Sequence, residues 1–246
     1  MSAVSEILKD IKIPKMVRFE QQFFKEKLDN VEEEVRFQMN QPFVRDRIKP
    51  GMQIAVGLGS RGISHYQLIA KTIVDEIRTM GAQPFIVASM GSHGGATVEG
   101  QREILSGYGI TEESMGCPLK IGIKTTVIGN TEDGLPVQID SYAAEADGII
   151  VVNRVKAHTA FTGPYESGLM KMLAIGLAKQ AGADYCHSRG FGKMAEMIPL
   201  FGRAIIHFSK LILGVAIDEN AYDETMMIKS IPAEKIAEEE PELLKL

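Results

Sequence analysis

Residues 53–65 read QIAVGLGSRGISH, an apolar run followed by glycines in the spacing G-x-G-x-x-G from Gly57 to Gly62. The apolar run predicts a buried strand, and the glycines predict a tight turn after it. The spacing of apolar residues over 65–80 then predicts a helix with Ser64 as its N-cap. The stretch is therefore a strand–turn–helix unit, which is the repeating element of α/β folds.

The same patterns recur along the chain. Further strands are expected at 84–90, 125–129, 148–155, 211–217 and 226–231, and helices at 97–106, 167–182 and 190–208, the last interrupted by Pro199. Residues 148–155, GIIVVNRV, are apolar enough for a strand buried on both faces, which is typical of parallel sheets. The sequence therefore predicts an α/β fold, a Rossmann-like open, mostly parallel sheet with helices on both faces.

The two ends of the chain carry less regular patterns. Residues 15–23 alternate in the manner of a strand or an extended arm, and residues 29–32 resemble the capping box of a helix that follows. The segment 231–246 is acidic and has the composition of a helix. We expect one α/β domain over residues 1–230 and an acidic helical connector over 231–246.

Composition excludes several classes of function. Of 246 residues, 27 are Lys or Arg and 32 are Asp or Glu, so the net charge is −5 and no nucleic-acid partner is expected. The chain has no apolar run long enough for a membrane span and no secretory signal pattern, so we expect no membrane partner and a cytoplasmic location. Cys117 and Cys186 are too few for a disulfide framework.

The glycine motif alone does not establish a dinucleotide site. Such a site also needs an acidic residue at the end of the second strand, where it binds the ribose hydroxyl groups. Here that strand ends in SMGSHGGAT, which contains no acid, and Arg61 within the motif would crowd the path of the pyrophosphate. An NAD(P)-binding oxidoreductase therefore remains only as an alternative.

Three polar side chains follow predicted strands at the edge where α/β sheets bind ligands. Arg61 follows the first strand, His93 the second, and His158 the strand at 148–155. An arginine can grip a carboxylate through two hydrogen bonds, and histidines can transfer protons near neutral pH. Each histidine could instead have a structural role, bonded to a loop carbonyl.

A lysine and a further histidine stand out later in the chain. Lys171 lies one turn into the predicted helix 167–182, on a face of small and apolar residues. The positive helix N-terminus and the apolar surroundings should both lower its pKa, which would make the amine a nucleophile or an attachment point. Alternatively, its side chain snorkels to solvent. His187, next to Cys186 in a predicted loop after that helix, is a candidate metal ligand, although one histidine is not a metal site.

Five residues of this chain, taken in order, resemble the site residues in the N-terminal domain of the lactate racemase family. They are Arg61, His93, His158, Lys171 and His187. The similarity runs from about residue 14 to the acidic tail, and it is most specific in three segments: ASMGSHGGAT, NRVKAHTAFTGPYESGLMKMLAIGLAKQAG and DYCHSRGF. The resemblance implies an isomerase, a racemase or epimerase, that acts on a small 2-hydroxy acid with a nickel-pincer nucleotide, a pyridinium cofactor that carries nickel.

The resemblance also implies a role for each residue. Lys171 would bind the cofactor through a thioamide, and His187 would complete the coordination of nickel. His93 and His158 would be the acid and base on the two faces of the substrate carbon, while hydride leaves and returns. Arg61 would hold a carboxylate. The cofactor can be absent from recombinant protein.

Two departures from the family pattern bear on these expectations. Racemases of the family tend to carry an acid and a proline flanking the arginine, where this chain has Leu58 and Gly62. The resemblance therefore does not identify which substrate this chain uses. Members also continue into a second α/β domain, so a second domain or a homo-oligomer partner is expected to complete the site. A non-catalytic binding or scaffold protein of the same fold remains an alternative.

Overall fold

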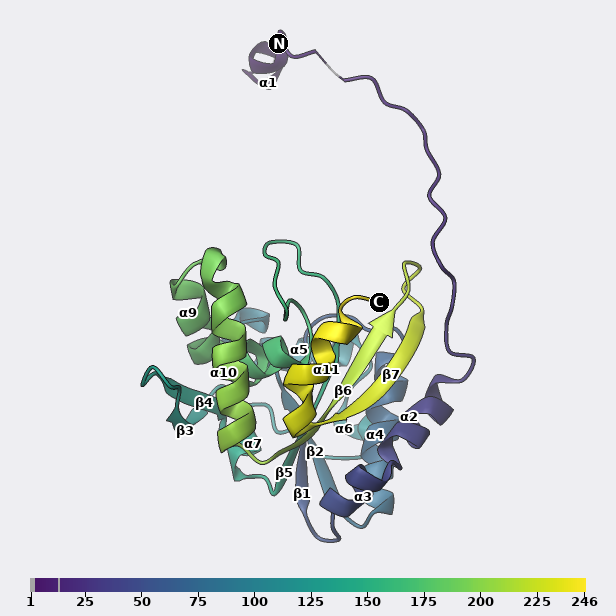
Figure 1. Ribbon diagram of the computed structural model, residues 1–246, viewed down its shortest axis with the longest axis vertical. Coiled ribbons are helices and arrows are strands. Elements are labelled where there is room, and N and C mark those ends of the chain that lie inside the picture. Colours follow the sequence, from purple (N-terminus) through teal and green to yellow (C-terminus); the bar gives the residue numbers. More distant parts are fainter. Residues whose placement is uncertain (1–2, 13) are drawn as a thin grey trace.

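The computed structural model describes residues 3–12 and 14–246 and contains a five-stranded sheet in the order β2-β1-β5-β6-β7 (Figure 1). Strands β2, β1, β5 and β6 are parallel, and β7 pairs with β6 in the antiparallel sense. This confirms the predicted α/β fold with a mostly parallel sheet. The strands of this sheet are β1 (Gln53–Leu58), β2 (Gln83–Ala88), β5 (Gly148–Arg154), β6 (Leu211–Glu219) and β7 (Thr225–Pro232).

Helices cover both faces of the sheet, and each face has its own apolar core. Side chains alternate along a strand, so Ile54 and Val56 of β1 pack beneath α2 and α4, whereas Ala55 faces the core formed with α8 and α10. The helices are α1 (Ala3–Leu8), α2 (Val31–Met39), α3 (Pro42–Arg47), α4 (Tyr66–Thr79), α5 (Val98–Gly107), α6 (Glu112–Met115), α7 (Ser141–Glu145), α8 (Leu169–Lys171), α9 (Lys179–Ser188), α10 (Met194–Phe208) and α11 (Ile236–Leu243). Shorter or irregular turns are η1 (Gly94–Ala96), η2 (Met172–Leu177), η3 (Phe191–Lys193) and η4 (Ala233–Lys235).

The segment 125–129 does not join the main sheet. It forms β3 (Thr125–Asn130), which pairs with β4 (Pro136–Asp140) in a separate antiparallel hairpin. The strand predicted at 125–129 is confirmed, but it lies outside the central sheet, and β4 was missed. The hairpin packs against α10 instead, with Val137 and Ile139 buried and Ile128 partly buried, whereas Val127 is exposed.

The predictions for four helices also need correction. The predicted helix 167–182 is divided into α8, the π-helical η2 and α9, with Lys179 at a positive φ of 56° where α9 begins. Pro199 lies inside α10 without interrupting it. The residues that cap α2 and α4 are Asn30 and His65, each one position later in the chain than the Asp29 and Ser64 predicted from the sequence.

The N-terminal residues leave the body of the protein as an extended arm (Figure 1). Residues 14–27 contain no helix or strand and are exposed, including Phe19 and Phe24. The arm joins the body where Leu28 N–H donates to the Thr225 carbonyl at 2.9 Å. Of the two alternatives for residues 15–23, the structure has the extended arm.

The acidic tail forms η4 and α11, so it is helical as predicted. Ile236 and Leu243 are buried in the core on the α8 side of the sheet. Among the described residues, no helix has the length and apolar character needed to span a bilayer.

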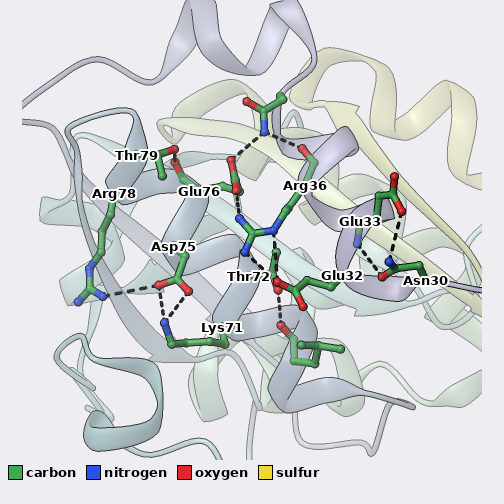
Figure 2. Close-up of polar contacts among 12 residues, drawn as sticks. Asn30, Glu32, Glu33, Arg36, Lys71, Thr72, Asp75, Glu76, Arg78 and Thr79 are labelled. Carbon is green, nitrogen blue, oxygen red and sulfur yellow. Dashed lines mark hydrogen bonds and ion pairs between the residues drawn. The ribbon is translucent and has the colours of Figure 1, made fainter.

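A buried carboxylate joins α2 to α4 (Figure 2). Glu76 of α4 is 5% exposed and accepts hydrogen bonds from Arg36 of α2 and, at 2.7 Å, from Asn40 Nδ2 just after it. Arg36 also reaches Glu32 on its own helix at 2.8 Å, but that pair is exposed. Because Glu76 is buried, its partners compensate its charge, and the contact should stabilise the packing of α2.

We predict that Glu76→Ala lowers the free energy of unfolding by about 1–2 kcal/mol, because it removes a buried acceptor shared by Arg36 and Asn40. Glu32→Ala is the matched control: it removes the exposed partner of the same arginine and should cost under about 1 kcal/mol. Urea denaturation measures both. Equal effects of the two substitutions would show that burial of Glu76 contributes nothing.

Candidate functional site

Arg61, His93 and His158 lie at one edge of the sheet. They follow β1, β2 and β5, and these three strands are adjacent and parallel, with β1 in the middle. The loop that carries Arg61 therefore lies between the loops that carry the two histidines. The sequence prediction that parallel strands bring these three residues to a common edge agrees with this topology.

His93 belongs to a turn of left-handed glycines. Gly94 has a φ of 67°, and a Cβ there would lie 2.6 Å from the Gly100 carbonyl carbon, so the turn requires glycine. The ring Nδ1 of His93 forms a hydrogen bond with Ser60 Oγ. Partial burial, followed by the positive charges of Arg61, Lys171 and His187, lowers the pKa of His93.

His158 lies in a loop that a buried glutamate holds in place. Glu166 is 7% exposed, and its carboxylate accepts the backbone N–H groups of His158 at 2.7 Å and Gly163 at 3.1 Å. The imidazole stacks on Phe161 with ring centroids 4.4 Å apart, and its Nδ1 accepts the Ala160 N–H at 3.1 Å. Burial lowers the pKa of His158, with a further contribution from Lys171.

Lys171 ends α8, beside this loop. Its Nζ lies 5.7 Å from the centre of the Phe161 ring, so one aromatic side chain contacts both Lys171 and His158. Burial, then the positive charges of Arg61 and Lys156, lower the pKa of Lys171 to about 8. At pH 7 about a tenth of such an amine is uncharged, far more than of an ordinary lysine, which favours a role as a nucleophile or an attachment point.

A carboxylate from the last helix fixes the start of α8. Glu240 of α11 is 1% exposed, and its Oε2 accepts the Met170 N–H at 2.7 Å. Asn153, near the end of β5, donates to the Gly168 carbonyl at 2.9 Å. Burial raises the pKa of Glu240 to about 7. The turn that carries Lys171 is thus bound to both the sheet and the tail helix.

The sequence predicted a loop at His187, but the residue lies in the last turn of α9. It is exposed, and its charge contributes to the lowered pKa of His93, so it belongs to the same cluster. Cys186 is buried, and burial raises the pKa of its thiol to about 11, which makes it a poor metal ligand. No three His, Cys, Asp or Glu side chains among the described residues form a group that could hold a metal ion.

A buried ion pair fixes the chain between Lys171 and His187. Lys179 is 1% exposed, and its Nζ lies 2.9 Å from Asp140 Oδ2 at the end of β4. The same ammonium donates to the Ala88 carbonyl, at the end of β2, at 2.6 Å. The start of α9 is therefore bound to both the central sheet and the separate hairpin.

Several residues that shape the site were not predicted from the sequence. Phe161 and Glu166 lie inside the segment already singled out for His158, so their position next to a candidate residue was a usable signal. Ser60 and Glu240 contact site segments only through tertiary structure, and Lys156 lies two residues before His158. No local pattern distinguishes these three from ordinary surface residues.

A family model described as lactate racemase N-terminal domain matches residues 8–197. Among solved structures, the lactate racemase apoprotein from Thermoanaerobacterium thermosaccharolyticum is similar, with a TM-score of 0.65 and 14% sequence identity over 86% of this chain and 54% of that chain. The chain thus spans about half the length of that relative, and at this identity the likeness shows the fold alone. No curated protein matches the chain.

We predict that acylation of Lys171 titrates with a midpoint near pH 8, because burial and neighbouring cations disfavour its charged form. Its folded pKa lies below the ordinary value of 10.5, so the amine is neutral from about pH 8 upward, where an exposed lysine is still protonated. Competitive labelling followed by mass spectrometry measures this midpoint.

Arg61→Ala should move the midpoint of Lys171 upward, since it removes a neighbouring positive charge. Arg189→Ala is the control, because Arg189 stacks on Tyr185 and is not among the charges that act on Lys171. A midpoint near 10.5 in the unsubstituted protein would contradict the expected desolvation.

We predict that Glu240→Ala lowers the free energy of unfolding by about 2 kcal/mol at about pH 5, since it leaves backbone N–H groups of α8 without acceptors. The folded pKa of Glu240, about 7, lies above its ordinary value of 4.5. The native protein therefore loses stability as pH rises from about 4.5 to 7, and the substitution removes that loss.

The destabilisation by Glu240→Ala should accordingly shrink above pH 7. Glu238→Ala, an exposed position on the same helix, is the control and should have little effect at any pH. Denaturant unfolding across this pH range measures the difference. A destabilisation that grows with pH would contradict the raised pKa.

Proposed function

The chain belongs to the lactate racemase N-terminal domain family, and we propose that it is the cofactor-bearing domain of a nickel-pincer-dependent racemase or epimerase. We propose a small 2-hydroxy acid as substrate and the cytoplasm as location. The observation that supports the proposal most is the electrostatic coupling of five groups from separate segments. Arg61, Lys171 and His187 lower the pKa of His93, and Lys171 and Arg61 lower that of His158.

The chemistry of these groups fits the proposed cofactor. Lys171 offers an amine with a pKa of about 8, suited to a covalent linkage. His187 offers one imidazole, which suits a metal whose other donors come from the cofactor. Arg61 and Lys156 add positive charge for a carboxylate or phosphate. When bound, the nickel-pincer nucleotide supplies a hydride acceptor.

The two histidines account for the protons. Both have a lowered pKa, so both rings are mainly neutral at pH 7. One imidazole takes the hydroxyl proton of the substrate as hydride leaves the carbon, and the other, protonated at that stage, gives a proton to the carbonyl oxygen when hydride returns to the opposite face. Arg61, between the two loops, is placed to bind the substrate carboxylate through two hydrogen bonds. Phe161 limits water around His158 and Lys171.

The site needs a cover for this chemistry. Arg61, His93 and His187 are exposed at the sheet edge, whereas hydride transfer requires that water be excluded. We propose that a second α/β domain, or a second copy of the chain, covers this edge. The match covers only 54% of the relative in the structural comparison, which accords with this proposal.

Expression in a host that makes the cofactor tests the function. We predict an intact-mass increase on Lys171 together with bound nickel. Lys171→Ala should lose both, and His187→Ala should keep the added mass but lose nickel. His93→Ala and His158→Ala should keep both and lose racemase activity by about 100-fold or more, the usual contribution of a general acid or base.

Lys193→Ala serves as the control, since that lysine is exposed and pairs only locally with Glu196. Added mass that persists in Lys171→Ala would disprove attachment at this residue. An unmodified chain from a competent host would favour a binding or scaffold role, and saturable binding of NAD(P) would favour an oxidoreductase.

A further inference from the structure

We propose that the two histidines of the site are chemically inequivalent, and that Ser60 is a positioning residue that allows His93 alone to exchange its ring proton between nitrogens. The catalytic meaning of this inference rests on the proposed function. Its structural basis is the partner of each Nδ1 atom, which is a backbone N–H for His158 and a hydroxyl for His93.

His158 has a fixed tautomer. A backbone N–H can only donate, so the Ala160 N–H at 3.1 Å requires a lone pair on Nδ1 of His158. The neutral ring then carries its proton on Nε2. Glu166 binds the backbone on both sides of this turn, and Phe161 stacks on the ring, so the ring cannot easily turn to exchange the two nitrogens.

His93 has no such restriction. Its Nδ1 partner is Ser60 Oγ, and a hydroxyl can either donate or accept. Both neutral tautomers of His93 are therefore compatible with the same contact. Ser60 itself is held in place, because its backbone carbonyl accepts the Tyr108 hydroxyl at 2.9 Å.

This difference assigns distinct starting roles. A base at Nε2 must carry its proton on Nδ1, which only His93 can do without losing its partner. His158 begins with Nε2–H and therefore acts first as a hydrogen-bond donor to the substrate, because a neutral imidazole is too weak an acid to release that proton. Ser60 Oγ accepts a hydrogen bond from Nδ1–H while His93 is a base, and it donates to Nδ1 when the ring carries its proton on Nε2.

Nitrogen NMR tests the assignment without the cofactor. In protein labelled with ¹⁵N-histidine, at about pH 8 so that the rings are neutral, long-range ¹H–¹⁵N spectra distinguish protonated from bare ring nitrogens. His93→Gln and His158→Gln assign the signals. We expect His158 to be protonated on Nε2 only and His93 to populate the Nδ1–H form.

Ser60→Ala should deplete the Nδ1–H form of His93 several-fold and leave His158 unchanged, since a neutral hydrogen bond shifts such an equilibrium by roughly that factor. Ser60→Thr should restore it. His65, whose Nδ1 contacts Ser64 and Thr225 away from the site, is the internal reference for correct folding. The proposal is overturned if Nε2 of His158 carries no proton, or if Ser60→Ala leaves the tautomer ratio of His93 unchanged.

In cofactor-loaded enzyme, Ser60→Ala should lower kcat by about 5- to 10-fold with nickel content unchanged, the effect of one lost hydrogen bond. This experiment separates the tautomer proposal from the proposed catalytic function. The expected tautomers in a chain that never acquires the cofactor would support the ring assignment and reject the catalytic function. Racemase activity in a protein whose two histidines have the same tautomer would support the catalytic function and reject the ring assignment.

Discussion

The close seating of α8 on the sheet is the constraint on which the site depends. A Cβ at Gly214 would lie 2.6 Å from Leu169 Cδ1, and a Cβ at Gly168 would lie 2.4 Å from Glu240 Oε1. Because both positions are glycine, Leu169 can lie directly on β6 and Glu240 can reach the first turn of the helix. Lys171 follows two residues after Leu169, so this contact determines the position of Lys171 relative to the ends of the strands. Without it, the lysine would be neither buried nor close to Arg61.

The positive character of the site follows from this arrangement. Arg61 and Lys156 lower the pKa of Lys171, and Lys171, Lys156 and Arg61 lower that of His158 against an opposing effect of Glu166. Repulsion among these groups is relieved when an anion binds between them. A carboxylate bound there would raise the pKa of the lysine and of the histidines, so anion binding and protonation would be coupled.

How far the sequence predicts this site depends on the range of the forces involved. The positions of Arg61, His93 and His158 follow from a general rule, because each comes directly after an apolar strand and parallel strands share one edge. The division of 167–182 was not predictable, since its apolar residues fit an unbroken helix equally well. The hairpin at 125–140 was missed because a short apolar run does not reveal its pairing partner. Ser60 and Glu240 owe their roles to contacts 33 and 70 residues away in sequence.

The π-helical turn η2 has a consequence for how such a site can evolve. A π turn holds one residue more than an α turn, and proteins often retain it at functional sites. Removing one residue from Met172–Leu177 would convert this turn to ordinary α-helix and leave the segment beyond it in nearly the same direction, because the turn is then completed by one residue fewer. His187 would keep its direction toward the site. The turn is therefore a place in the helix where a change of length by one residue is easier to accommodate than it is in a regular α-helix.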